Sequence, residues 1–143
     1  MLPASNEKEE EKAATRFAGA FLMPREHLEQ EVGKHRNRLG YKEIMDLKRL
    51  YRVSGAALLV RLRDIGIISD SILIYSFQTV ARNWRTEEPE QLEHPDCRGE
   101  REKPRRFERI CYRALAEGLI SLTKAAELLR SPIEDVEAGL KGP

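Results

Sequence analysis

Apolar residues recur at helical spacing from the start of the chain. Between Asn6 and Met23 they follow the i, i+3, i+4, i+7 pattern of one buried helix face. Asn6 is expected to cap this helix, because its side chain can accept from a free backbone N–H and glutamates follow in the first turn. Pro24 is expected to end it and to begin a short helix that reaches Val32 and stops at Gly33. The apolar face consists of Ala14, Phe17, Ala18 and Phe21.

Residues 41–84 carry three further helical patterns separated by tight turns. Ser54 and Ser69 are expected to cap the second and third of these helices, and Gly66 to close the second. The third helix carries the longest stripe and is the expected core partner of the other two. The stripes consist of Ile44, Leu47 and Tyr51, then Leu58, Leu62 and Ile65, then Leu73, Phe77, Val80 and Trp84.

Two segments lack such a pattern. Residues 34–40 are polar and basic, which favours a solvated loop, with a cationic patch as the alternative. Residues 86–104 combine dense charge with proline and glycine, which is typical of a loop or a mobile linker. The sequence therefore predicts a helical core over residues 1–85, a charged linker over 86–104 and a C-terminal helical segment over 105–143.

The C-terminal segment has its own amphipathic pattern, which ends at Gly118. Ser121 and Ser131 are expected to cap two short helices, the second with Pro132 at its first position. No useful strand-like alternation appears, so the fold class is all-α: a compact bundle of short helices with helix-turn-helix-like units and an appended helical C-terminal tail. The first stripe of this segment consists of Phe107, Ile110, Cys111, Ala114 and Leu115.

Composition narrows the function classes. Charged residues make up 34% of the 143 residues, but the net charge is only +1, so the overall balance favours neither nucleic acid nor an anionic membrane. No apolar run is long enough for a signal peptide or a membrane span. Cys97 and Cys111 are unclustered, which indicates a reduced cytoplasmic protein and cannot close a zinc site. Cys111 is expected to be a buried small apolar residue, and Cys97 an exposed thiol.

Three segments share one family resemblance. Residues 11–24 contain Glu, then Ala, then Phe-Ala, then Leu-Met-Pro, and this pattern resembles the helix that follows the catalytic helix in the ImmA/IrrE family of zinc metallopeptidases. Residues 51–69 look like the next segment of that family, and residues 106–143 are similar to its C-terminal tail. The resemblance covers nearly all of the chain, but only the part that lies downstream of the chemistry in such proteins.

The resemblance implies a metal role for one residue. In this family, zinc is held by the two histidines of His-Glu-x-x-His and by a Glu on the next helix, which corresponds to Glu11. The chain contains His27, His35 and His94 but no His-Glu-x-x-His, and Glu26-His27 has Glu31 where a second His would be needed. No peptidase activity is therefore expected of these residues. Glu11 is a zinc ligand only in a longer protein, and otherwise a solvated carboxylate.

Two segments resemble helix-turn-helix units, and they support the alternative of a DNA-binding transcriptional regulator. In residues 122–140 the second helix is acidic, which repels phosphates, and Arg130 stands where such turns commonly have Gly. In residues 41–66 the second helix has cations but begins with Gly55-Ala-Ala, which cannot donate to base edges. Helix packing is favoured over DNA binding for both. The acidic residues are Glu134, Asp135 and Glu137.

The expected partners are proteins. The resemblance implies a regulatory setting, often in a mobile element, in which the peptidase cleaves or binds a helix-turn-helix repressor. Without a catalytic helix to cover it, the face with Phe17 and Phe21 would be exposed to water, and an exposed apolar face tends to find a partner. A homo-oligomer or intertwined dimer is therefore predicted. A truncated protein-interaction module is a further alternative.

Overall fold

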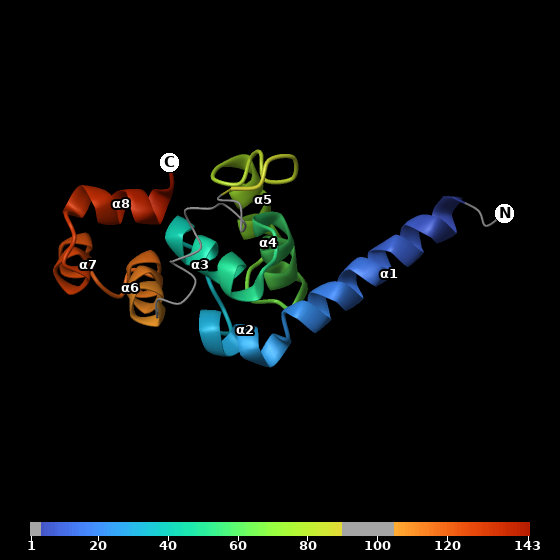
Figure 1. The fold of residues 1–143 in the computed structure, drawn as a ribbon, viewed down its shortest axis with the longest axis horizontal. Coiled ribbons are helices and arrows are strands. Elements are labelled where there is room, and N and C mark those ends of the chain that lie inside the picture. Colours follow the sequence, from blue (N-terminus) through green and yellow to red (C-terminus); the bar gives the residue numbers. More distant parts are fainter. Residues whose placement is uncertain (1–3, 90–104) are drawn as a thin grey trace.

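A computed structural model describes residues 4–89 and 105–143 of the chain. Within these residues the protein has eight helices and no strand, which confirms the all-α prediction (Figure 1). The helices are α1 (Ala4–Leu22), α2 (Arg25–Val32), α3 (Tyr41–Tyr51), α4 (Gly55–Asp64), α5 (Asp70–Gln78), α6 (Arg106–Ala116), α7 (Leu122–Leu129) and α8 (Ile133–Lys141).

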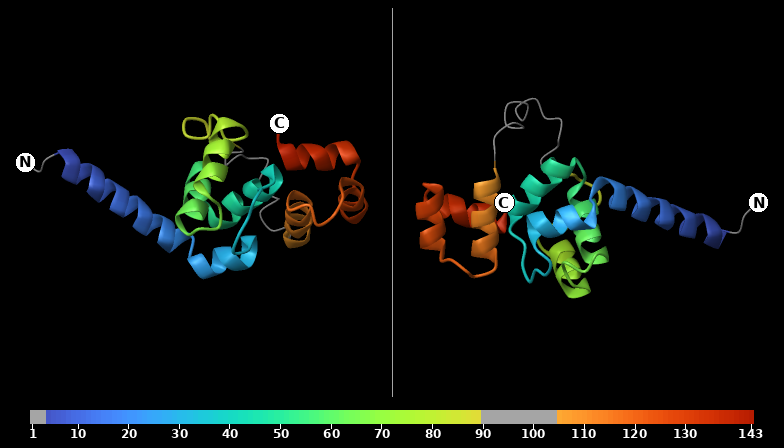
Figure 2. Two further views of the ribbon diagram at one scale, coloured as in Figure 1. Left: turned by 180° about the vertical axis from the view of Figure 1, so that it is seen from behind. Right: turned by 90° about the horizontal axis from the view of Figure 1, so that it is seen from below.

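The helices form a body from which one helix projects. Helices α2 to α5 make its centre, α6 to α8 lie at one end, and α1 extends away from the other end in all three views (Figures 1 and 2). The root of α1 contacts α4, where Arg61 Nε donates to the carbonyl oxygen of Met23 at 3.1 Å. The long first helix is thus anchored only near its C-terminal end.

Two separate apolar clusters hold the body together. The larger one lies among α2 to α5 and includes the predicted core residues Ile44, Leu47, Leu58 and Leu62, all 0–1% exposed. The smaller one joins α6 to α8. It consists of Tyr112, Ala125, Ala126 and Val136.

Most predicted caps are confirmed. The hydroxyls of Ser54, Ser69 and Ser121 accept from the backbone N–H three residues later. Gly33 and Gly66 have positive φ at the ends of α2 and α4, which suits glycine because it has no Cβ.

Two predicted caps and one helix length are wrong. Asn6 lies inside α1, because the helix already includes Ala4, a good helix former. Ser131 Oγ donates to the carbonyl of Leu129, so Pro132 occupies the N-cap of α8 without a side-chain cap. Helix α5 ends at Gln78, and the chain then turns so that Trp84 still reaches the core.

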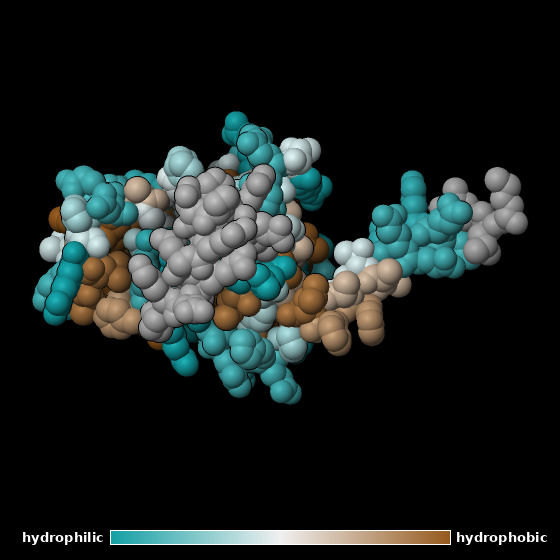
Figure 3. Space-filling view, viewed as in Figure 1, coloured by the Kyte–Doolittle hydropathy of each residue, from teal (hydrophilic) through white to brown (hydrophobic). Residues whose placement is uncertain are grey.

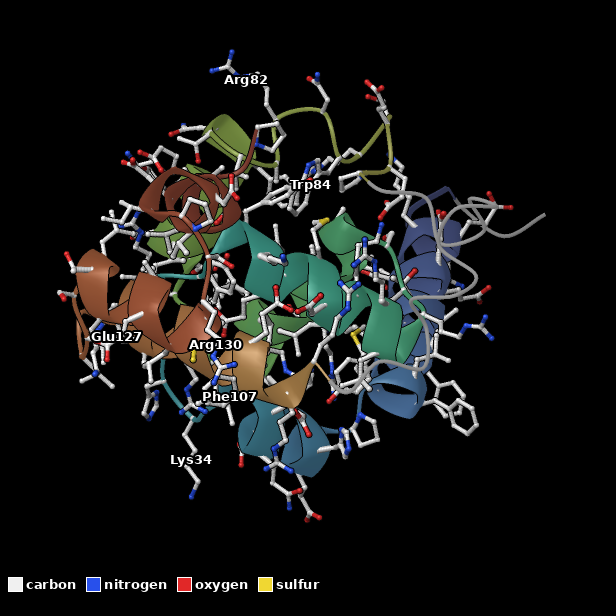
Figure 4. The ribbon with its side chains drawn as sticks, turned by 60° about the vertical axis from the view of Figure 1, so that its left-hand side comes forward. Lys34, Arg82, Trp84, Phe107, Glu127 and Arg130 are labelled. Atoms are coloured by element: carbon white, nitrogen blue, oxygen red, sulfur yellow. The ribbon has the colours of Figure 1, made fainter. Side chains whose placement is uncertain are left out.

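The predicted face of α6 is also partly wrong. Phe107 and Ile110 are 58% and 50% exposed, whereas Arg109 and Tyr112 are buried. The reason is that Arg109 pairs with Glu31 of α2, and Tyr112 packs against α8. Both contacts turn the opposite side of α6 toward the body. In Figure 4, Phe107 lies on the outside of α6.

The charged segment after α5 begins in contact with the body. Glu88 and Pro89, at the start of the predicted linker, contact Lys48 of α3 and Gly55 of α4. Residues 90–104, with His94 and Cys97, lie outside the described residues.

Candidate functional site

Helix α1 exposes an apolar face. Ala14, Phe17, Ala18 and Phe21, named here the arm face, are all exposed, with Phe17 and Phe21 at 74% and 76%. Figure 3 shows the outer half of the projecting helix in hydrophilic colours and the half nearer the body in hydrophobic ones. The predicted helix face therefore exists, but no described residue covers it.

Glu11 lies on the hydrophilic half of α1. It is exposed, and its backbone carbonyl accepts from the hydroxyl of Thr15 at 2.8 Å. Among residues 4–89 and 105–143, no group of three or more His, Cys, Asp or Glu residues is arranged to hold a metal ion. Zinc needs at least three protein ligands, so the described residues do not fit this metal. Glu11 offers one ligand only.

His27 on α2 contacts Tyr51 of α3. Its Nδ1 lies 2.5 Å from the hydroxyl of Tyr51, and the two rings meet edge to face. Burial and the nearby charge of Glu31 raise the pKa of Tyr51 to about 12, against the opposing effect of Arg109. His27 therefore serves as a packing partner between α2 and α3. His35 is exposed in the loop that follows α2.

A buried charge cluster joins the loop before α3 to α6. Arg36 is 3% exposed and makes a two-pronged contact with Glu43, with Nη2 to Oε2 at 2.9 Å, while its Nε donates to Glu117 at 2.5 Å. Burial alone would lower the pKa of Arg36, but the hydrogen bonds and charges of the two carboxylates outweigh it and raise the pKa. The prediction of a solvated loop is thus wrong at Arg36, because two carboxylates compensate its burial.

Further ion pairs continue this junction along α6. Glu31 pairs with Arg109, Lys42 with Glu108 at 2.5 Å, and Asp46 with Arg105 at 3.2 Å. None of these pairs is predicted by the sequence pattern, because their members are far apart along the chain. The sequence holds a local signal only for Glu43 of the charge cluster: the Gly40-x-x-Glu43 spacing lets the Glu43 carboxylate accept from the Gly40 N–H before α3, at 3.3 Å. The junction fixes α6 and is structural.

The first helix-turn-helix-like unit is blocked at the point where such a unit would read DNA. The N–H of Gly55 at the start of α4 donates to Glu88 at 2.9 Å, and a Cβ at Gly55 would lie 2.8 Å from the Trp84 ring. The N-terminal end of a recognition helix must enter the groove. In α4 this end is covered by a carboxylate and an indole. In Figure 4, Trp84 lies against the body, whereas nearby Arg82 points outward.

The second helix-turn-helix-like unit, in residues 122–140, has the turn geometry but lacks the positive charge that DNA binding needs. Arg130 adopts φ 51° and ψ 42° after α7, so the doubt about a left-handed turn without Gly is removed; Arg52 does the same after α3. However, Glu134 and Asp135 are exposed in the first turn of α8, where phosphates would have to approach. The charge objection therefore stands.

Cys111 is buried, as predicted for a small apolar residue. Burial and the charge of Glu108 raise the pKa of its thiol, which makes it a poor nucleophile.

Comparison with known proteins gives one match. No curated protein and no solved structure matches the chain significantly. Within the described parts of the chain, no helix combines the length and apolarity that a membrane crossing requires. The family model that matches is the IrrE N-terminal-like domain, over residues 2–63, which include helices α1 to α3 and all of α4 except Asp64. Residues 2–63 are thus similar to the IrrE N-terminal-like domain, whose family is one of zinc peptidases.

Proposed function

We propose that the chain is a helical, partner-binding part of an IrrE/ImmA-like regulatory protein, and that α1 is its binding arm. The observation that carries this proposal is the exposed arm face, with Phe17 and Phe21 about three-quarters exposed on a helix that contacts the body only near its C-terminal end. A soluble helix normally buries such a face. Binding through the arm explains why an apolar face stands in water.

The zinc chemistry of the family requires the His-Glu-x-x-His residues, which this sequence does not contain. A protein that also carries His-Glu-x-x-His would supply two ligands and would use Glu11 as the third, and zinc would then activate a water for peptide hydrolysis. The described residues lack such a set, so no catalytic step is assigned to them. The family resemblance supports a helix-turn-helix repressor as the substrate of such a protein, and the few cysteines support a cytoplasmic setting.

The zinc content of the native product tests this proposal. The cellular product is captured through the segment 41–84, and its intact mass and zinc content are measured together. A larger species with zinc supports the peptidase setting. A metal-free species near 16.5 kDa supports a non-catalytic binding module.

A matched pair of variants then tests Glu11. In a zinc-containing product, Glu11→Gln is expected to lower the zinc content, whereas Glu9→Gln, at a neighbouring exposed carboxylate, is not. Full zinc content in Glu11→Gln would remove Glu11 from the ligand set.

DNA binding receives less support. The start of α4 is covered by Glu88 and Trp84, and α8 is acidic at its start. Duplex binding that weakens steeply with salt would revive this alternative, and no binding at low salt would remove it.

A further inference from the structure

The arm face continues toward the N-terminus as a charged stripe. Going back from Phe21 in alternate steps of four and three residues leads through Phe17 and Ala14 to Glu10 and Glu7, all exposed. This spacing is that of the contact seam in a coiled coil. One end of the seam is therefore acidic and the other apolar.

The base of the arm carries positive charge. Arg25 begins α2 directly after the arm; its side chain is 58% exposed and lies 3.7 Å from the carboxylate of Glu29, a surface pair that leaves it open to a further carboxylate. Arg61 of α4 lies close by, since it donates to Met23 O, and partial burial together with the charge of Arg25 lowers its pKa against the effect of Asp64. The acidic outer half of α1 thus has a cationic counterpart at its own root.

We propose that a second copy of the chain covers the arm face, with the two α1 helices antiparallel and crossing between Phe17 and Ala18. This inference rests on the proposed function, because it names the occupant of the binding arm. In this register Phe21 of one copy lies opposite Ala14 of the other, so that a large side chain meets a small one. Glu10 then lies at the other copy's α1–α2 junction, beside Arg25.

Charge selects the antiparallel orientation. In a parallel pair, Glu7 and Glu10 would each face the same glutamate of the other copy, and like charges at a seam are unfavourable. The antiparallel pair replaces these contacts with Glu10 beside Arg25. It also closes on itself by a two-fold axis, so that no arm is left free to recruit a third copy. Because α1 projects clear of the body, a second helix can lie along it (Figures 1 and 2).

Sedimentation equilibrium of the full chain tests the pairing. The expected result is a monomer–dimer equilibrium in the micromolar range that Phe17→Ser weakens by at least about tenfold. Ile74→Ser is the matched control, because Ile74 is 55% exposed on α5 and lies outside the seam. A wild-type chain that stays monomeric at about 100 μM, or equal weakening by the two variants, would overturn the pairing.

Disulfide trapping tests the orientation. Single variants Glu10→Cys and Arg25→Cys are made with Cys97→Ser, so that Cys111, which is buried, is the remaining native thiol. A mixture of the two is expected to form a cross-linked heterodimer under mild oxidation. Glu10→Cys alone is expected to form little dimer, and efficient cross-linking of that variant with itself would establish a parallel pair and overturn the proposal.

The outcomes separate this inference from the proposed function. If the chain is monomeric and its longer native product holds zinc through Glu11, the pairing is overturned. The binding arm is then kept, because the helix with the two histidines covers the arm face. A monomeric, metal-free product in which Phe17→Ser changes no association overturns both. A dimer lost in Phe17→Ser and retained in Ile74→Ser supports both.

Discussion

Helices α1 and α3 both lie within residues 2–63, which match the family model, yet α3 is largely buried and α1 is exposed. In α3, six consecutive residues from Glu43 to Lys48 are buried, and three of them are charged. In α1, no residue from Asn6 to Leu22 is buried, although two are phenylalanines. The helix with buried charges lies at the centre of the body, and the helix with exposed aromatic rings projects from it (Figure 1).

The two helices differ in whether their side chains find partners among the described residues. The buried charges of α3 each have an oppositely charged group nearby. Glu43 pairs with Arg36 in the preceding loop, whereas Asp46 and Lys48 pair with groups far away in the sequence, Arg105 and Glu88. The exposed rings of α1 have no such counterpart among the described residues. The buried charges of α3 are therefore compensated within the chain, whereas the apolar face of α1 stays exposed to water.

Removing one member of the buried pair in α3 should produce the largest effect. Glu43→Ala leaves the buried Arg36 guanidinium without its two-pronged partner, and breaking a buried pair in this way costs about 3–5 kcal/mol of unfolding free energy. Urea unfolding measures this loss. The matched change on the arm, Glu10→Ala, should stay within about 0.5 kcal/mol.

A double variant separates the charge from the packing. Arg36→Met with Glu43→Leu replaces the pair by apolar side chains, which is often neutral in buried sites, so it should recover most of the loss. A cost below about 1 kcal/mol for Glu43→Ala alone would mean that water reaches Arg36 and that the junction is not buried.

Apolar truncations sharpen the same comparison. Leu47→Ala in α3 removes a fully buried side chain and should cost about 2–5 kcal/mol. Phe17→Ala in α1 removes a larger side chain, but at concentrations where the chain is monomeric it should change stability by less than about 0.5 kcal/mol. Thermal or urea unfolding of both variants checks this. Equal losses would show that the arm face is buried in the monomer.

Much of the fold could be predicted from the sequence because its signals are local. The serine caps at Ser54, Ser69 and Ser121 and the glycine at Gly33 each depend on residues within one turn, and all were predicted correctly. The predicted face of α6 failed for the opposite reason. Its orientation depends on Arg109 meeting Glu31, a pair that is distant in sequence and adds no periodicity.

The candidate site, too, could be predicted from the sequence only in part. The apolar pattern predicted the arm face, but periodicity alone cannot tell whether a face is buried within the chain or kept for a partner. Arg36 in its basic loop looked like a solvated cation, since the carboxylates that pair with it come from α3 and from the end of α6, at Glu43 and Glu117. The role of Glu11 depends on residues outside this sequence and stays a prediction.

Glycine substitutions should have smaller and opposite effects in the two parts of the molecule. At Gly55 a new Cβ would lie 2.8 Å from the Trp84 ring, so Gly55→Ala should destabilise the body by about 1–3 kcal/mol. At Gly19 the nearest contact would be 3.6 Å, to Arg61, so Gly19→Ala should stabilise α1 by up to about 1 kcal/mol through helix propensity. Melting temperatures of the two variants check the signs. Two changes of the same sign would contradict the contrast.

Substitution of Asp46 should have the smallest effect on the free energy of unfolding, and this effect should depend on pH. Burial raises the pKa of its carboxyl above the ordinary value of 3.8, and the hydrogen bond from Arg105 only partly offsets this. A carboxyl with a raised pKa binds its proton more tightly in the folded protein. Its contribution to stability therefore falls as the pH rises from the ordinary value through the raised one, and the penalty remains at higher pH.

Asp46→Asn removes this titration. The difference in unfolding free energy between this variant and the wild type should therefore move in favour of the variant as the pH is raised from about 4 to about 7. Arg105→Gln should do the reverse and steepen the loss, because it removes the group that offsets the burial of Asp46. Urea unfolding at several pH values measures both. If the difference in unfolding free energy between Asp46→Asn and the wild type stays constant with pH, the Asp46 carboxyl has the same pKa in the folded and unfolded chain. Burial in α3 would then not destabilise its charged form.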